Sequence, residues 1–220
     1  MSNHQFIQIL DIAVTLALVS AYVAVWQRDL ITMVRVVAFQ GLAIVGVSLL
    51  LGNHNSDYEL IIVAFLQLAL KVIILPRVLL RVVRESHDIR EVEPLVNVPA
   101  SLVAAWVLTI VAYAATRDIV ATGSTDQSIA MPIGFAIALI GVFLMVTRRK
   151  AVTQIVGFLL LDNGIALVAL LATAGVPIVV ELGASIDLLL AVLVLQVLVA
   201  RLGAAHGEEV DLNRLRELRD

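Results

Sequence analysis

The sequence predicts an all-α membrane protein with about seven transmembrane helices, its N-terminus outside and its C-terminus cytoplasmic. Of its 220 residues, 61% are hydrophobic and 15% are charged, and the mean hydropathy is +1.02. Soluble domains carry more charge, about 25% of residues. Apolar stretches of about 20 residues, the length that crosses a bilayer, recur along the chain. Lys and Arg gather between alternate stretches, as in membrane proteins with a defined orientation.

Local signals support several of the spans. The N-terminus, MSNHQF, lacks the Lys or Arg of a secretory signal, so we interpret the first apolar stretch as a retained helix. Pro76 should kink or loosen the third span, since proline lacks the N–H of a helical hydrogen bond. Pro132 lies near the start of the fifth span, where proline is tolerated. The predicted spans are 6–26, 30–52, 58–84, 98–117, 128–147, 151–173 and 177–202.

Basic residues determine the predicted orientation. With the N-terminus outside, the cytoplasmic segments hold twelve Lys and Arg residues and the outer segments hold only Arg117. Arg35 and Lys71 lie inside spans. This asymmetry predicts a cytoplasmic C-terminus. The twelve cytoplasmic residues are Arg28, Arg77, Arg81, Arg84, Arg90, Arg148, Arg149, Lys150, Arg201, Arg214, Arg216 and Arg219.

The spans group into four regions. Residues 1–97 form an N-terminal three-helix unit with a cytoplasmic loop, and residues 98–127 form a connecting helix and outer loop. Residues 128–202 form a C-terminal three-helix unit, and residues 203–220 form a cytoplasmic tail. The charged loop 85–97 and the tail 203–220 are the segments that we expect to contact a soluble partner.

Three ionisable side chains lie deep within the apolar spans. Lys71 occurs in LIIVAFLQLALKVIIL, Asp162 in AVTQIVGFLLLDNGIALVALL and Asp187 in LGASIDLLLAVLVLQVLV. All three fall near the expected midplane. A charge at the centre of a membrane helix costs roughly 2.5 to 3.5 kcal/mol on insertion scales. Intramembrane charges therefore indicate function by default, often a proton or ion relay.

Two interpretations of these charges remain open at this stage. A buried Lys beside a buried Asp can form a proton-relay element, charged when paired and favouring neutral forms when separated. Alternatively, Lys71 forms a structural ion pair with Asp162 or Asp187, and breaking it leaves a costly buried charge.

Several polar residues near the spans are auxiliary candidates. Asn163 is more typical of a hydrogen bond between helices than of a relay, and we expect the same of Gln40 and Gln67. Glu181 lies near the outer surface, where it is either a gate or simply solvated. Arg35 is close enough to the inner surface for its side chain to snorkel, and pairing with a partner subunit is the alternative.

Composition also bounds the chemistry. Cysteine is absent, and the four histidines all lie in polar segments. The sequence therefore predicts no catalytic residues, no metal site and no cofactor bound by this chain. The basic residues are too dispersed for nucleic-acid binding. We expect a multi-pass membrane protein that is not an enzyme on its own.

Several motifs carry a resemblance to known membrane complexes. The second half contains GFLLLDNGIAL, GASIDLLLAVLVLQ, a preceding TRRK loop and the tail VDLNRLREL. It resembles the small three-helix subunit of complex I and of multisubunit cation/proton antiporters. Both mid-membrane acids, Asp162 and Asp187, are usually Glu in that complex I subunit.

The whole length, with LALKVIILPRVLL around Lys71, more closely resembles component E of hydrogenase-4 and formate hydrogenlyase-type complexes. This resemblance covers nearly all of the chain. It implies a subunit between large antiporter-like subunits and a membrane anchor that carries soluble iron–sulfur and hydrogenase-like subunits. The iron–sulfur clusters or metal centre would then lie on those partners, and this chain would add buried charges to proton or Na⁺ translocation.

Two other classes of function compete with this one. The chain is alternatively a stand-alone secondary transporter, although it lacks a clear pair of broken helices for a substrate. It is otherwise a structural scaffold between larger subunits. Activity of the isolated protein distinguishes the first alternative, and neutralising the buried charges without loss of coupling distinguishes the second.

Overall fold

The computed structural model describes residues 3–85, 96–122 and 129–173. Every regular element in these ranges is a helix, which agrees with the predicted fold class. The expected span 177–202, with Asp187, and the expected gate Glu181 lie outside the described residues. So do the tail 203–220 and most of the charged loop.

The described helices match the first six predicted spans. Five stretches are long and apolar enough to cross a membrane, and α6 is a shorter apolar helix of 17 residues. The chain is therefore a membrane protein. The elements are α1 (Asn3–Trp26), α2 (Leu30–Asn55), α3 (Tyr58–Gln67), the π-helix η1 (Leu68–Ile74), α4 (Leu75–Glu85), α5 (Val98–Thr122), α6 (Met131–Thr147) and α7 (Ala151–Thr173).

Short polar residues mark where several helices begin. The Asp29 carboxylate accepts a hydrogen bond from the Thr32 backbone N–H at 2.8 Å and caps α2. Asp57 caps α3 in the same way, by accepting from the N–H of Glu59 at 2.9 Å. Such caps satisfy N–H groups that have no partner within the helix. They allow the chain to turn sharply between neighbouring spans.

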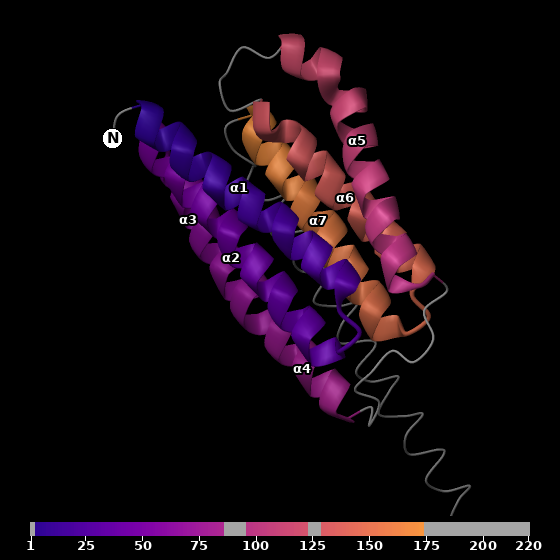
Figure 1. Ribbon diagram of the computed structural model, residues 1–220. Helices are drawn as coiled ribbons and strands as arrows, with labels where there is room; N and C mark the ends of the chain where they lie inside the picture. Colours follow the sequence, from indigo (N-terminus) through magenta and orange to yellow (C-terminus); the bar gives the residue numbers. More distant parts are fainter. Residues whose placement is uncertain (1–2, 86–95, 123–128, 174–220) are drawn as a thin grey trace, which may run out of the picture.

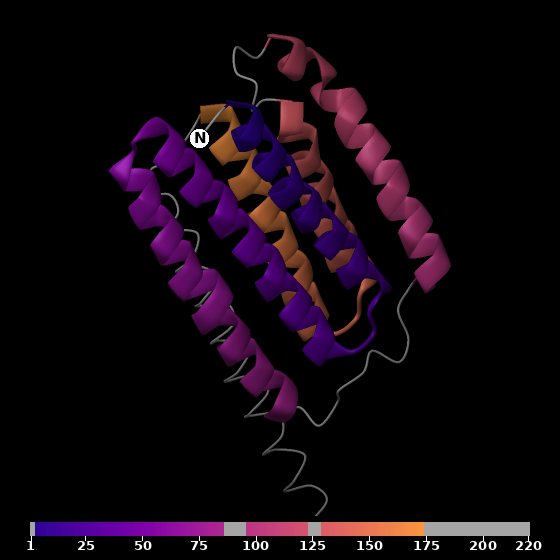
Figure 2. The same cartoon turned by 60° about the vertical axis from the view of Figure 1, so that its left-hand side comes forward.

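The helices form a bundle built around two hairpins (Figure 1). One hairpin is α1 with α2 and the other is α6 with α7; α1 packs on α6, and α2 packs on α7. Helix α5 lies at one edge of the bundle against α6, and the continuous third span lies at the other edge against α2 (Figure 2). One end of the bundle holds the α1–α2 turn, the end of α4 and the α6–α7 turn. We call it the arginine-rich end, because Arg28, Arg84 and Arg148 lie in these three segments.

Glycines bring α6 and α7 into direct backbone contact. Each helix carries two glycines seven residues apart, Gly134 and Gly141 on α6, and Gly157 and Gly164 on α7. A Cβ atom on Gly141 would lie 2.4 Å from the backbone N of Leu161 and 2.7 Å from the Gly157 carbonyl oxygen. In membranes, where helices gain little from hydrophobic burial, such small residues permit the close packing that joins helices.

The third span contains a wide turn around its lysine. The π-helical segment Leu68–Ile74 interrupts it, and the Leu75 N–H donates to the Leu70 carbonyl five residues back. Pro76 follows at once and has no N–H to donate, so the α-helical pattern loses a bond there. The expected loosening near Pro76 therefore takes the form of a π-helix, a feature that often marks functional sites.

One arginine of the predicted cytoplasmic set is buried. Arg148 is 2% exposed, and its Nη2 donates to the Val25 carbonyl at 2.7 Å. Its charge thus lies at the C-terminal end of α1, where cations interact favourably with the helix dipole. Gln154 Nε2 donates in turn to the Arg148 carbonyl at 3.0 Å. Arg148 therefore ties the two hairpins together at the arginine-rich end.

The glycine contacts predict a strong response to one added methyl group. Gly141→Ala places a Cβ against the backbone of α7, which cannot move aside as a flexible side chain would. We expect a loss of about 1 to 3 kcal/mol in the free energy of unfolding. Unfolding of the purified protein in detergent or bicelles measures this loss. Gly46→Ala is the matched control, because nothing lies within 4 Å of its Cβ position; an equal loss there would contradict the packing role.

Candidate functional site

The third span and α7 are joined by an ion pair in the middle of the bundle. Lys71 Nζ lies 2.7 Å from Asp162 Oδ2, and the two side chains are 3% and 16% exposed. Lys71 is thirteen residues from either end of the stretch Tyr58–Arg84. Asp162 lies eleven residues into the stretch Ala151–Ala172. Both groups therefore lie near the centre of their spans, as the sequence predicts.

Helix α2 lies next to both members of the pair and shapes the space between them. It packs against the π-helical segment and against α7. Gly41 on α2 faces the lysine, since a Cβ there would lie 3.8 Å from Lys71 Cβ and 3.5 Å from Val72 Cγ2. A Cβ there would make only ordinary van der Waals contacts, so the π-helical segment packs against α2 at this position. The Lys71 side chain then reaches Asp162 on α7.

A second polar contact lies one residue further along α7. Asn163 Nδ2 donates to Gln40 Oε1 at 3.0 Å, and Gln40 Nε2 donates to the Ala17 carbonyl at 2.9 Å. This chain of buried amides links α7, α2 and α1. The expectation that Gln40 and Asn163 hydrogen-bond between helices is confirmed. Their direct pairing has no signal in the sequence, since they are 123 residues apart.

A third polar contact lies one turn before the lysine. Ser48 Oγ on α2 lies 3.0 Å from Gln67 Oε1, and it also lies 3.2 Å from the Ile44 carbonyl oxygen. Because a serine hydroxyl has one hydrogen, it can donate fully to only one of these acceptors at a time. Gln67 thus hydrogen-bonds between helices, as expected, and extends the polar surroundings of Lys71 along α2.

Two atoms of these amides keep hydrogen-bonding capacity. Within the described ranges, the buried Gln67 Nε2 and Asn163 Oδ1 have no hydrogen-bond partner. Buried polar groups nearly always bond to protein or to ordered water. Gln67 lies one helical turn before Lys71, and Asn163 directly follows Asp162. The site therefore combines a charged pair with polar groups able to bind water.

Of the predicted site residues, the structure brings Lys71 and Asp162 together, with Asn163 beside them. Arg35 lies elsewhere, exposed on α2 at a groove between α1 and α2. Asp187 and Glu181 lie outside the described residues, so their relation to the pair stays a prediction. In the described part of the chain, no group of three or more His, Asp or Glu residues could hold a metal ion.

These features define a multi-helix membrane protein with an ion pair at the centre of its spans. The chain is 45% identical to the uncharacterized protein Rv0085 of Mycobacterium tuberculosis over 221 aligned positions, which cover 100% of both chains. It therefore belongs to the same family as Rv0085. No family model matches the chain, and no solved structure matches it.

A more distant similarity connects the chain to a hydrogenase component. Hydrogenase-4 component E of Escherichia coli K12 and of Shigella flexneri is 31% identical over 96 residues, 44% of this chain and 44% of theirs. The expected resemblance to component E is thus found, but over less than half of the chain rather than nearly all of it. Similarity over the full length is found with the mycobacterial protein.

The ion pair predicts a non-additive pattern of stability. Lys71→Met or Asp162→Leu alone leaves one buried charge without its partner, and we expect each to lower the free energy of unfolding by about 3 kcal/mol. The double variant removes both charges, so we expect it to be more stable than either single variant. A double-mutant cycle on the purified protein measures this coupling, and additive losses would contradict a direct interaction.

Proposed function

We propose that this protein is a non-catalytic membrane subunit of a hydrogenase-4-like or complex I-like respiratory oxidoreductase. In this proposal, Lys71 and Asp162 belong to a path that couples proton or Na⁺ translocation to electron transfer in other subunits. The observation that carries the proposal is the Lys71–Asp162 ion pair at mid-span. The partial similarity to hydrogenase-4 component E supports the same class of assembly.

The physical reason lies in the low dielectric around the pair. Two opposite charges in contact stabilise each other strongly where water does not screen them. A partner subunit that separates the two groups, or that places another charge beside them, weakens this mutual stabilisation, and a proton can then move. The pair is therefore a two-state element that a distant redox event can bias, provided that the event changes the local charge or packing.

The surroundings of the pair suit such a change. The π-helical turn that carries Lys71 has a less regular hydrogen-bond pattern than an α-helix, because Pro76 supplies no donor. The buried Gln67 Nε2 and Asn163 Oδ1 offer groups to which water binds. In the proposal, water at these atoms connects the pair to a longer path that includes Asp187 and Glu181.

The proposal also names the partners of the chain. These are large antiporter-like membrane subunits and a membrane anchor with soluble iron–sulfur and hydrogenase-like subunits. The clusters or metal centre that carry electrons lie on those partners. The complex resides in the plasma membrane of a prokaryote, with the arginine-rich end of this subunit facing the cytoplasm.

A structural role is the second candidate function. The 2.7 Å contact between Lys71 and Asp162 supports it as well as it supports a relay. A paired lysine and aspartate can fix the packing of the third span on α7 without moving protons. The two roles differ in what happens when both charges are removed together. A structural pair is replaceable by apolar groups, whereas a relay is not.

The decisive experiment compares single and double variants in the assembled complex. In membrane vesicles, electron transfer is started with the electron donor of the complex, and proton movement is followed with a pH-sensitive dye. We expect Lys71→Met and Asp162→Asn to lower the protons moved per electron several-fold, by more than they lower complex abundance. Glu59→Gln, which neutralises an exposed acid in the first turn of α3, should change neither quantity.

The Lys71→Met and Asp162→Leu double variant then separates the two roles. A relay predicts restored abundance with coupling still low, because no ionisable group remains at the site. If both the abundance of the complex and the protons moved per electron were restored, the relay would be contradicted and the structural pair would be supported. Ion transport by the isolated, reconstituted chain would instead favour a stand-alone transporter.

A further inference from the structure

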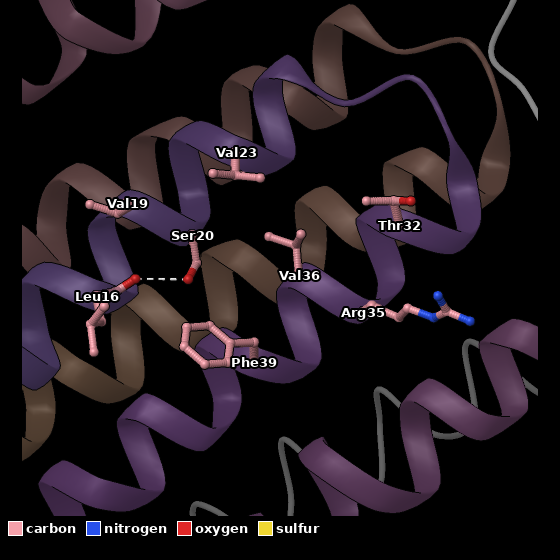
Figure 3. A pocket seen from close by; sticks show the side chains of 8 residues that line it. All are labelled: Leu16, Val19, Ser20, Val23, Thr32, Arg35, Val36 and Phe39. Atoms are coloured by element: carbon pink, nitrogen blue, oxygen red, sulfur yellow. Dashed lines mark hydrogen bonds between the residues drawn. The ribbon is translucent and has the colours of Figure 1, made fainter.

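A groove lies between α1 and α2 (Figure 3), and neither member of the ion pair lines it. It has a volume of about 270 Å³. It is lined by apolar side chains from both helices, and several are half-exposed, among them Val19 at 51% and Phe39 at 50%. The eight lining residues are Leu16, Val19, Ser20, Val23, Thr32, Arg35, Val36 and Phe39.

The polar groups of the groove are satisfied locally, with one exception. The Ser20 hydroxyl donates to the Leu16 carbonyl at 2.7 Å, and the Thr32 side chain donates to the Asp29 carboxylate. Both hydroxyls thus bond within the protein, and the lining is apolar toward an occupant. Arg35 is the one charged residue of the lining, and no carboxylate of the described residues forms an ion pair with it.

The position of Arg35 fits the depth of a lipid headgroup. It lies six residues beyond the helix cap Asp29, or about 9 Å along α2 from the α1–α2 turn. In Figure 3 its guanidinium extends away from the apolar side chains, toward the end of the groove at which Thr32 lies. A long basic side chain near a helix end places its charge at the membrane interface while its stem stays in the apolar region.

The size of the groove selects the occupant. The lining residues run from 16 to 23 on α1 and from 32 to 39 on α2, which is about 10 Å of helix. One leaflet of the hydrocarbon core is about 15 Å thick, so the groove spans one leaflet only. A partner transmembrane helix, about 10 Å wide and crossing both leaflets, does not match this space.

We propose that the groove binds one acyl chain of an anionic phospholipid, whose phosphate is held by Arg35. The apolar lining accommodates the chain, and the guanidinium pairs with the phosphate oxygens, which it suits in charge and geometry. The site does not depend on the proposed relay, and it is independent of which membrane face the arginine-rich end occupies.

A tryptophan about one turn beyond the groove lining on α1 provides the readout. The chain has two tryptophans, Trp26 and Trp106. Trp26 lies about one turn beyond Val23 on α1 and is 64% exposed, whereas Trp106 lies on α5. In a Trp106→Phe background, brominated lipids that bind the groove quench Trp26 fluorescence. In a Trp26→Phe background, Trp106 reports on lipid at a distant surface.

The experiment reconstitutes the full chain into phosphatidylcholine vesicles with increasing mole fractions of brominated phosphatidylglycerol or brominated phosphatidylcholine. We expect about fivefold preference for phosphatidylglycerol at Trp26, the effect of one basic residue near an anionic surface. Arg35→Gln should reduce this preference to about one. Arg28→Gln, which neutralises an exposed arginine of the adjacent turn, should leave most of it.

A groove-filling variant tests the chain-binding part. Val19→Phe enlarges a half-exposed lining residue and should abolish the preference with Arg35 intact, whereas Val103→Phe on exposed α5 should not. Equal quenching by both lipids, an equal effect of Arg28→Gln, or an unchanged preference in Val19→Phe would overturn the proposal. Loss of the preference when the chain is in its assembled complex would show that a protein partner covers the groove, and would also overturn it.

Discussion

The lysine at the centre of the third span is the constraint to which the middle of this bundle is adapted. An ammonium group at mid-membrane is costly unless an opposite charge lies beside it. Asp162 supplies that charge at 2.7 Å from Lys71 Nζ. The π-helical turn changes the direction in which the lysine leaves its helix, and Gly41 of α2 packs against this turn. The local irregularity of the third span therefore serves the contact between Lys71 and Asp162.

The acid depends in turn on how α7 is held. Its glycines place α7 in backbone contact with α6, and that contact fixes the height of Asp162 relative to the other spans. Asn163 then reaches Gln40, which reaches the Ala17 carbonyl on α1. At the arginine-rich end, Arg148 holds the end of α1. The two hairpins are joined by these polar contacts at two depths, so the ion pair lies in a framework that resists sliding.

The structure adds a second charged feature of a different kind. Arg35 faces the surface rather than the interior, at the end of an apolar groove. Burial distinguishes the two: Lys71 is buried and paired with a protein carboxylate, while Arg35 is exposed. Their positions along the sequence already differ, because Lys71 is thirteen residues from either end of its span and Arg35 is near the start of α2. The groove itself has no sequence signal, since it arises from the packing of α1 on α2.

Hydropathy and proline placement by themselves determined that this protein is a helical membrane protein and where its described spans lie. They also determined that its third span loosens before Pro76 and that Lys71 and Asp162 lie near the centres of their spans. These properties depend on the free energy of moving each segment from water into lipid, which is a sum over neighbouring residues. The tertiary structure alone decided which acid of the described spans meets Lys71, that Gln40 meets Asn163, and that Arg148 is buried rather than solvated. Those contacts join residues far apart in the chain, and aliphatic spans of similar composition carry little information about which faces meet. Helix packing in a membrane is governed by the fit of small residues and by pairing of polar groups, so partners emerge only when the helices are placed together.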